Sequence, residues 1–303
     1  MIGDGAQQKP DESGRRVVVG VDGSPGATRA LDWAAREARA RGVLLHVVVA
    51  ESAPPGMPSP GHPVLDQALA RCAQREFPQL VTGAVRQDSP ATALLREAAD
   101  AELLVVGRSG RGGQAGTHLG SVPASVLRYA PCDVAVVAGS PTGGPPHWTG
   151  DVLAGIDGSV HDRAVLDAAF AAARARSGRL MVVHAPGARA GRWDPPSDAR
   201  ALLDAAIAGG VPRYPDVEVA GRVVEDGPIH ALDALSAGAA LLVIGAVGRD
   251  SLPGQLLGSV PRALAGRIAC PVLVVRDRVR APNDGQGLGP GPEGLSGLGR
   301  GAR

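Results

Sequence analysis

The amino-acid sequence contains an internal duplication. Residues 17–50 align with residues 152–185 without a gap, and many apolar and glycine positions correspond along the two segments. Residues 105–123 and 243–261 also align, since each carries Gly-x2-Gly, nine further residues and Gly-Ser. Self-similarity at a fixed period indicates that one structural unit, of about 135 residues, occurs twice. A chain of 303 residues is long enough for each copy to bury a core of its own.

The duplication predicts two folded domains with a short connection. We expect the first domain over residues 15–139 and the second over residues 151–277, with a linker rich in Gly and Pro over residues 140–150. Residues 1–14 and 278–303 carry too few apolar side chains to form a packed core, so we expect both ends of the chain to be disordered.

Short apolar runs alternate with amphipathic segments inside each unit. In the first unit the predicted strands are 17–21, 44–50, 80–87, 103–107 and 134–138, and the predicted helices are 25–41, 64–75, 92–101 and 121–129. After its own first strand, the second unit has predicted strands at 180–185, 217–225, 241–245 and 272–276. Val/Leu runs without polar alternation are typical of parallel strands that helices cover on both faces. The pattern therefore predicts an α/β fold with a doubly wound parallel sheet in each unit.

Composition and charge argue against several classes of partner. The formal net charge is +1, which provides no field to attract nucleic acid or an anionic membrane. Aromatic residues make up 2% of the chain, too few for platforms that stack single strands. No apolar run approaches the ~20 residues of a membrane span, and the first residues lack the apolar centre of a signal peptide, so we expect a cytoplasmic protein. Cys72, Cys132 and Cys270 are too scattered for a disulfide framework or a zinc site, and we expect buried thiols.

The glycine-rich segments gain significance from their place in the predicted fold. The chain has 43 glycines, so the spacing alone is a weak motif. Gly107 and Gly245, however, end the predicted fourth strands, and ligands of doubly wound sheets bind beyond the carboxyl ends of strands. Gly120-Ser121 then opens a helix, whose unpaired N–H groups and positive dipole end suit a phosphate. The alternative is that Ser121, like Ser259 in the second unit, only caps its helix.

Asp22 and Asp157 follow the predicted first strands in the stretches "GVDGS" and "GIDGS". Each carboxylate can close an Asx turn, or it can accept hydrogen bonds from an adenine amino group or a ribose hydroxyl. The neighbouring glycine-rich segments favour contact with a ligand. These segments are not phosphate-binding P-loops, because neither ends in Gly-Lys-Ser/Thr, and the first strands are not followed by Gly-x-Gly-x-x-Gly.

In these features the chain resembles the universal stress proteins of the ATP-binding type, specifically the tandem two-domain type of actinobacteria. The resemblance covers residues 16–276 and rests on Gly-x2-Gly-x9-Gly-Ser after the fourth strand and Asp-Gly-Ser after the first. It implies two tandem Rossmann-like, five-stranded parallel sheets of order 3-2-1-4-5, paired through their fifth strands. It also implies ATP as the ligand, with Mg²⁺ accompanying it. The residues that it assigns to the nucleotide are Asp22, Ala50, Gly107, Ser109, Gly110, Gly120, Ser121 and Val122 in the first unit, and Asp157, Ala185, Gly245, Val247, Gly248, Gly258, Ser259 and Val260 in the second.

The chain departs from the family pattern at the expected phosphate end. Pro123 and Pro261 stand where the family often has a hydroxyl, and each proline also removes a backbone N–H. Val247 stands where a polar or basic residue is usual. Candidates for further phosphate contacts are Arg108, Arg111 and Arg249.

The two sites are expected to differ in their affinity for ATP. In the second unit Asp250 brings a negative charge near the expected phosphate position, and Pro253 stiffens the loop. The first unit has Ser109 and a loop richer in glycine. We therefore expect the first site to bind ATP more tightly than the second.

The sequence favours a regulatory protein over an enzyme. It shows no Ser-His-Asp order, metal-ligand cluster or carboxylate pair, and Lys9 is the only lysine, so fast phosphoryl transfer is not expected. His46 and His184 lie inside predicted strands, where packed side chains are more common than bases, and His118 has no counterpart in the second unit. The leading hypothesis is an ATP-binding sensor or adaptor of the stress response, with an unknown protein partner, an internal pseudo-dimer and homodimer formation. The alternatives are a slow ATPase or another nucleotide-dependent enzyme of this fold, and a structural pseudo-dimer that binds no ligand.

Overall fold

The computed structural model describes most of both units. The described residues are 15–51, 62–74, 81–110, 119–138, 150–186, 196–249, 251–252 and 254–276. Both chain ends for which disorder is expected lie outside these ranges, as does the expected linker apart from Gly150. Those expectations therefore stay predictions.

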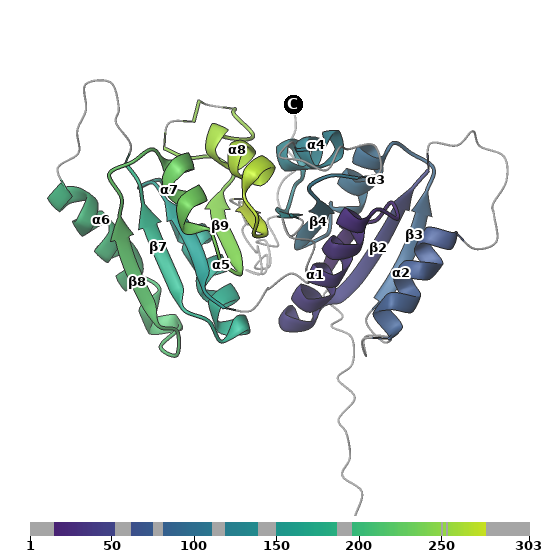
Figure 1. Ribbon diagram of the computed structural model, residues 1–303, viewed down its shortest axis with the longest axis horizontal. Helices are drawn as coiled ribbons and strands as arrows, with labels where there is room; N and C mark the ends of the chain where they lie inside the picture. The colour runs from purple at the N-terminus through teal and green to yellow at the C-terminus, as the bar shows by residue number, and fades with distance from the viewer. Residues whose placement is uncertain are drawn as a thin grey trace, which may run out of the picture.

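The first unit alternates strands and helices along the chain (Figure 1). Its elements are β1 (Arg16–Gly20), α1 (Pro25–Arg41), β2 (Leu44–Ala50), α2 (Pro63–Ala73), β3 (Val81–Arg86), α3 (Pro90–Glu97), β4 (Leu103–Gly107), α4 (Ser121–Tyr129) and β5 (Asp133–Val137). The predicted elements are confirmed, and α1, β2, β4 and α4 have the predicted bounds. The largest difference is in α3, which begins earlier than predicted and ends at Glu97, four residues before the predicted end. It begins earlier because Ser89 caps it: the Ser89 hydroxyl accepts a hydrogen bond from the Thr92 N–H at 3.3 Å.

The second unit repeats this order. Its elements are β6 (Val152–Ile156), α5 (Asp162–Arg176), β7 (Leu180–His184), α6 (Pro196–Ala208), the 3₁₀ helix η2 (Val211–Arg213), β8 (Val219–Val223), α7 (Pro228–Leu235), β9 (Leu241–Gly245), α8 (Ser259–Arg267) and β10 (Val272–Val275). One difference from the first unit lies at the start of α5. The alignment with Pro25 of α1 points to Val160, but α5 begins at Asp162.

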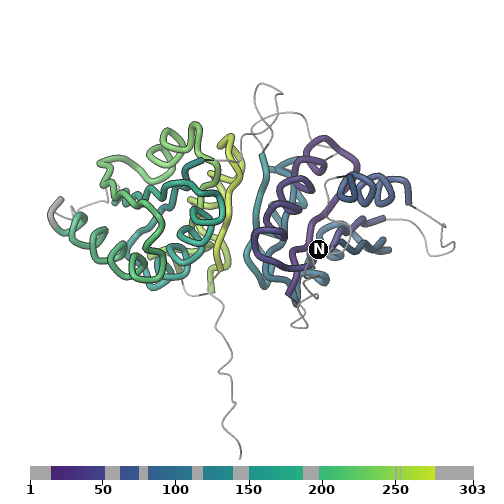
Figure 2. Tube along the Cα trace, turned by 90° about the horizontal axis from the view of Figure 1, so that it is seen from below, coloured from purple at the N-terminus to yellow at the C-terminus, as the bar shows by residue number. Residues whose placement is uncertain are grey.

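The strands of both units form one sheet of ten strands. Its order is β3-β2-β1-β4-β5-β10-β9-β6-β7-β8, so each unit contributes parallel strands in the order 3-2-1-4-5. The fifth strands join the units in antiparallel pairing, with Val136 opposite Val272 and Val134 opposite Val274. Figure 2 shows β5 and β10 side by side between the two units. The expected pairing is confirmed, and the two predicted sheets are continuous with each other.

Helices cover both faces of the sheet, and each face has its own apolar core. Val17 and Val19 of β1 pack on the face covered by α1, α2, α5 and α6, together with the fully buried Trp33. Val18 packs on the opposite face with Leu127 of α4, in the core shared by α3, α7 and α8. Alternate residues of one strand are thus buried on opposite faces, which is why the strand sequences lack polar alternation.

The three cysteines are buried free thiols, as expected. Burial raises the pKa of the Cys270 thiol to about 12, which favours the protonated form. Cys132 and Cys270 both belong to the core on the α4 and α8 face, and Cys72 belongs to the other core.

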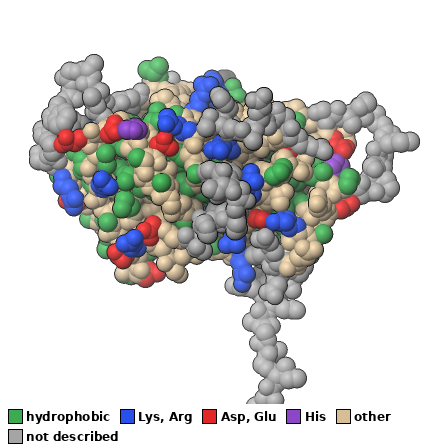
Figure 3. Space-filling view, in the orientation of Figure 1, with side chains coloured by type: hydrophobic (Ala, Val, Ile, Leu, Met, Phe, Trp, Pro, Cys, Tyr) green, Lys and Arg blue, Asp and Glu red, His purple; other side chains and the backbone are tan. Residues whose placement is uncertain are grey.

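The surface carries both signs of charge. On the face shown in Figure 3, acidic and basic side chains occur on both units, in keeping with a net charge of +1. In the part of the chain that the structure describes, no helix is long and apolar enough to span a membrane.

Polar contacts reinforce the pairing of the units. The Arg276 N–H donates to the Asp133 carboxylate at 2.9 Å, and the Arg276 guanidinium donates to the Leu127 carbonyl. On the other face of the sheet, Arg176 of α5 donates to the buried carboxylate of Glu37 in α1. The boundary between the units therefore combines strand pairing, apolar packing, hydrogen bonds and a buried ion pair.

A fragment of residues 16–138 is expected to self-associate. Removing the second unit exposes the backbone N–H and C=O groups of β5, and an unpaired apolar strand edge templates pairing with another chain. Size-exclusion chromatography with light scattering measures the result. A well-folded, soluble monomer of this fragment would contradict the role assigned to the β5 edge.

Candidate functional site

Each unit has a cavity at the carboxyl ends of its first, second and fourth strands. The first cavity, between β1, β2, β4 and the start of α4, has a volume of about 700 Å³. The second cavity, between β6, β7, β9 and the start of α8, has a volume of about 220 Å³. Both lie where the strand order reverses, which is the usual ligand position in doubly wound sheets.

The residues that the sequence assigned to a nucleotide all line these cavities. The first cavity is lined by Asp22, Ala50, Gly107, Ser109, Gly110, Gly120, Ser121 and Val122, among others. The second is lined by Asp157, Ala185, Gly245, Val247, Gly248, Gly258, Ser259 and Val260, among others. Residues far apart in the sequence meet here because the carboxyl ends of parallel strands share one edge of the sheet.

The helices α4 and α8 begin without a side-chain cap. Their N-cap residues are Gly120 and Gly258, and neither forms a side-chain hydrogen bond to the first turn. Ser121 and Ser259 are the first helical residues, so they do not cap these helices as the alternative interpretation required. In contrast, Ser24 caps α1 through its hydroxyl oxygen. The N-terminal N–H groups of α4 and α8 thus have no serine hydroxyl holding them.

The first turn of α4 offers two N–H groups at the edge of the first cavity. Pro123 is the third helical residue, is buried, and has no N–H. The donors are therefore the N–H groups of Ser121 and Val122, at the positive end of the helix dipole. Such a helix start suits an anionic group.

The aspartates that follow the first strands close Asx turns. Asp22 accepts a hydrogen bond from the Ser24 N–H at 2.9 Å, and Asp157 accepts one from the Ser159 N–H at 3.1 Å. Asp157 also accepts the Arg249 N–H at 2.6 Å, which holds the second glycine-rich loop against the turn. A carboxylate oxygen has two lone pairs, so it can accept more than one hydrogen bond.

Two loop glycines have a packing reason as well as the expected role beside a ligand. A Cβ atom on Gly110 would lie closer than 3.0 Å to the Asp22 carboxylate, and a Cβ on Gly248 would lie equally close to Asp157. A Cβ on Gly107 would lie 2.9 Å from the backbone of Gly26 in α1. These positions require glycine because the loop backbone packs directly on the turn and on the start of α1.

Arg108 is not among the residues that line the first cavity, and its expected phosphate contact stays a prediction. Its guanidinium donates to the Ile268 carbonyl of the second unit at 2.9 Å, at the end of α8. Burial lowers the pKa of Arg108, with a further contribution from the charge of Arg29. Arg249 lines the second cavity. Four residues that the sequence singled out, Arg111, His118, Asp250 and Pro253, lie outside the described residues.

Asp162 lines the second cavity and was not predicted from the sequence. Its carboxylate accepts the N–H groups of Asp157 at 3.2 Å and of Gly158 at 2.8 Å, in the turn after β6. Burial raises the pKa of Asp162, although these two hydrogen bonds act in the opposite direction. The gap-free alignment pairs Asp162 with Ala27, and this mismatch was the signal in the sequence that could have revealed it.

Glu51 and His62 line the first cavity and were also not predicted. The His62 Nε2 and the Glu51 Oε1 lie 2.7 Å apart. Glu51 directly follows β2 and His62 is the N-cap residue of α2, so both stand at the carboxyl edge of the sheet. The signal in the sequence was that Glu51 directly follows the predicted second strand and that His62 stands shortly before the predicted second helix, so both could be placed at the sheet edge.

The histidines inside strands are packed, as the sequence predicted. His46 is buried beside Thr82, with 2.8 Å between Nδ1 and the hydroxyl oxygen, and burial lowers the pKa of His46. His184 is buried with Nδ1 3.0 Å from the Ile156 carbonyl oxygen, and it also lines the second cavity. No group of three or more His, Cys, Asp or Glu that could hold a metal occurs among the described residues.

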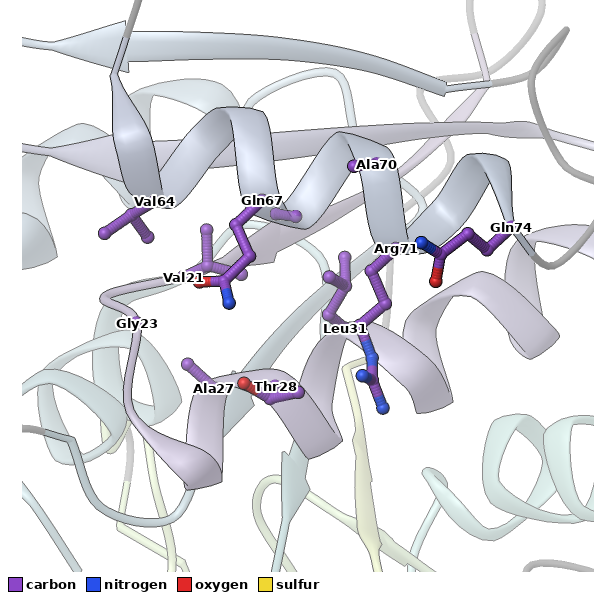
Figure 4. Close-up of a pocket in the computed structure, with 11 residues that line it drawn as sticks. Val21, Gly23, Ala27, Thr28, Leu31, Val64, Gln67, Ala70, Arg71 and Gln74 are labelled. Carbon is purple, nitrogen blue, oxygen red and sulfur yellow. The ribbon is translucent and has the colours of Figure 1, made fainter.

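A hollow between α1 and α2 adjoins the first cavity (Figure 4). Its volume is about 250 Å³, and Val21, Ala27 and Val64 line both spaces. Arg71 extends from α2 toward α1 and donates two hydrogen bonds of 2.7 Å to the Asp32 carboxylate. This ion pair fixes α2, and with it one wall of the first cavity, against α1.

Fold and site together define a tandem, doubly wound α/β protein with a cavity at the carboxyl edge of each half of its sheet. Comparison with known proteins gives the family. The profile of the Universal stress protein family matches residues 14–138 and again residues 149–276. The chain belongs to the universal stress protein family.

Curated relatives and solved structures share the tandem organisation. Universal stress protein Rv2005c of Mycobacterium tuberculosis is 36% identical over 292 residues, covering 86% of this chain and 96% of the relative. Universal stress protein Rv2623 of the same organism is 34% identical over 285 residues, with the same coverage. A functionally unknown protein of Pseudomonas aeruginosa, PA1789, superposes with a TM-score of 0.59 at 20% identity, over 86% of this chain and 92% of its own. At that identity the likeness concerns the fold alone.

Proposed function

We propose that the first cavity binds ATP and that the protein is a nucleotide sensor or adaptor of the stress response. The observation that carries this proposal is the convergence of every assigned first-unit residue on one cavity of about 700 Å³. Small-molecule sites have volumes of about 300–1,000 Å³, so the cavity has room for a mononucleotide. The names of the curated relatives support a role in stress.

The chemistry of the first cavity suits the two ends of the nucleotide. The N–H groups of Ser121 and Val122 would face the phosphates at the positive end of α4. Val48 and Ala50 supply apolar wall for the adenine, and the Asp22 carboxylate would accept a ribose hydroxyl or the adenine amino group. Mg²⁺ accompanying ATP would be held by the phosphate oxygens, because the described residues form no metal-ligand cluster of their own.

Calorimetric titration of the protein with ATP tests the proposal. The protein is first unfolded, freed of any co-purified nucleotide and refolded, and the released nucleotide is identified. Saturable binding of ATP by the refolded protein is the expected result. If protein shown to be folded and free of nucleotide gives no saturable heat with ATP, the proposed function is wrong.

The first site is expected to bind ATP at least tenfold more tightly than the second, a difference of about 1.4 kcal/mol. Gly120→Val alters the first cavity alone, and Gly258→Val alters the second cavity alone. A Cβ at either position would stay about 3.4 Å from its nearest neighbour, so both variants should fold with a side chain in the cavity. Calorimetry on the two variants gives the comparison. Equal affinities, or a tighter second site, would refute the ranking.

A further inference from the structure

Ala27 and Asp162 occupy equivalent positions in the two units. The alignment of residues 17–50 with residues 152–185 pairs them, and each lines the cavity of its own unit. Ala27 is 5% exposed and contributes a methyl group. Asp162 contributes a half-buried carboxylate. One position therefore presents an apolar surface to the larger cavity and an acidic group to the smaller one.

The Asp162 carboxylate is held at the wall of the second cavity. Its two hydrogen bonds to the N–H groups of Asp157 and Gly158 fix it against the turn after β6. Asp157 itself lines the cavity, so two carboxylates stand at this wall. In the first unit the corresponding turn carries one carboxylate, Asp22, because Ala27 has no polar side-chain atom. The second carboxylate that lines the first cavity, Glu51, follows β2 and pairs with His62 instead.

The different start of α5 explains why Asp162 reaches this turn. In the first unit α1 begins at Pro25, and Gly26 packs so closely that a Cβ there would lie 2.5 Å from the Ser109 carbonyl oxygen. In the second unit His161 stands at the position of Gly26, and the helix begins only at Asp162. Asp162 is the first helical residue and therefore lies beside the turn after β6. Its carboxylate accepts hydrogen bonds from the N–H groups of Asp157 and Gly158 in that turn.

We propose that Asp162 excludes ATP from the second cavity, so that the protein binds one ATP, in the first cavity. This inference rests on the proposed function of the first cavity. The second cavity, about 220 Å³, is smaller than ordinary small-molecule sites. Its two carboxylates stand together at the turn after β6, where their like charge repels phosphate oxygens, whereas the turn after β1 carries the single carboxylate of Asp22. The described lining residues of the second cavity include one arginine, Arg249, whose backbone N–H is bonded to Asp157.

The test exchanges the two residues in the full-length chain. Asp162→Ala is expected to raise the ATP stoichiometry from one to two, with at least a tenfold gain in the affinity of the second site. The reciprocal change Ala27→Asp is expected to lower the affinity of the first site at least tenfold. Asp162→Asn keeps the size of the side chain and one acceptor oxygen but removes the charge, and should give part of the gain. Asp167→Ala is the matched control, because Asp167 lies on the same helix and pairs with Arg213 outside the second cavity.

Calorimetry gives stoichiometry and affinity, and thermal melting without ATP shows whether each variant folds. Two equal ATP sites in the wild type, or one site in a folded Asp162→Ala variant, would overturn the inference and leave the proposed function intact. If Asp162→Ala does not fold, Ala27→Asp and Asp162→Asn decide, and wild-type behaviour of both would overturn it. If the wild type binds no ATP, the proposed function fails, and with it the claim of one bound ATP. Binding by Asp162→Ala would then support the exclusion of ATP by Asp162 alone, and no binding would overturn both.

Discussion

Replacing Glu37 with alanine is expected to lower the free energy of unfolding by about 3–5 kcal/mol, the range found when one partner of a buried ion pair is removed. The Glu37 side chain is 7% exposed and accepts a hydrogen bond from Arg176, whose side chain is 9% exposed. Arg41 lies on the other side, with 3.5 Å between its Nε and the second carboxylate oxygen. Without the carboxylate, two guanidinium groups face each other and one of them is nearly buried.

The duplication explains why one carboxylate serves two arginines. Arg41 and Arg176 are equivalent residues at the ends of α1 and α5, whereas the equivalent of Glu37 is Ala172. Arg41 lies one helical turn after Glu37 in α1, and the pseudo-symmetric pairing of the units brings Arg176 to the same carboxylate. Arg176 also lies over the ring of Trp33. Glu37→Ala therefore weakens the contact between units as well as the packing of α1.

Urea denaturation of the full chain measures this effect. The matched control is Asp204→Ala, which removes an exposed ion pair with Arg200, the two side chains being 53% and 57% exposed. Exposed pairs contribute about 0–1 kcal/mol, so the control should unfold close to the wild type. If Glu37→Ala and Asp204→Ala lower the free energy of unfolding by similar amounts, burial of the Glu37 ion pair does not increase its contribution to stability.

Gly110→Ala is expected to remove most of the stabilisation that ATP confers. A ligand that binds only the folded state adds about 2.7 kcal/mol at a hundredfold excess over Kd. A Cβ on Gly110 would overlap the Asp22 carboxylate, so the loop or the aspartate must shift, and both line the first cavity. The shift displaces the backbone on which the phosphate end of the site depends. Gly110→Val should have the same effect more strongly.

Thermal melting with and without ATP measures this loss. Gly227→Ala is the matched control, since a Cβ at Gly227 would have nothing within 4 Å and Gly227 lies outside both cavities. The control should keep the full ATP shift. If ATP raises the melting temperature of Gly110→Ala as much as that of the wild type, the glycine-rich loop does not contribute to nucleotide binding. No shift in the wild type at millimolar ATP would remove the basis of the proposed function.

The sequence predicted most elements because their signals are local. Ser24 and Pro25 mark the start of α1 and Gly42 adopts a positive φ of 66° just after its end, so both bounds follow from neighbouring residues. The apolar runs gave the strands, and the duplication gave two copies of one topology. The sites followed from topology as well: once Gly107 ends the fourth strand and Asp22 follows the first, their meeting at one sheet edge is a geometric consequence.

The contacts of long side chains were predicted less well than the elements and the sheet topology. Arg108 stands in the glycine-rich loop, and nothing near it in the sequence indicates that its guanidinium reaches Ile268, 160 residues away. An arginine has several rotatable bonds, so its direction depends on which partner the packed units bring within reach. The contact with Ile268 could not be predicted for that reason.

The amino-acid sequence determines the order of the elements, the topology of each unit and the residues at each sheet edge. Periodicity and helix caps depend on residues close together in the sequence, and strand order follows simple rules of connection. The volumes of the two cavities, the partners of Arg108 and Glu37, and the place of Asp162 beside the β6 turn follow only from the folded chain. These properties depend on distances between residues far apart in sequence, and close packing fixes such distances to a fraction of an ångström.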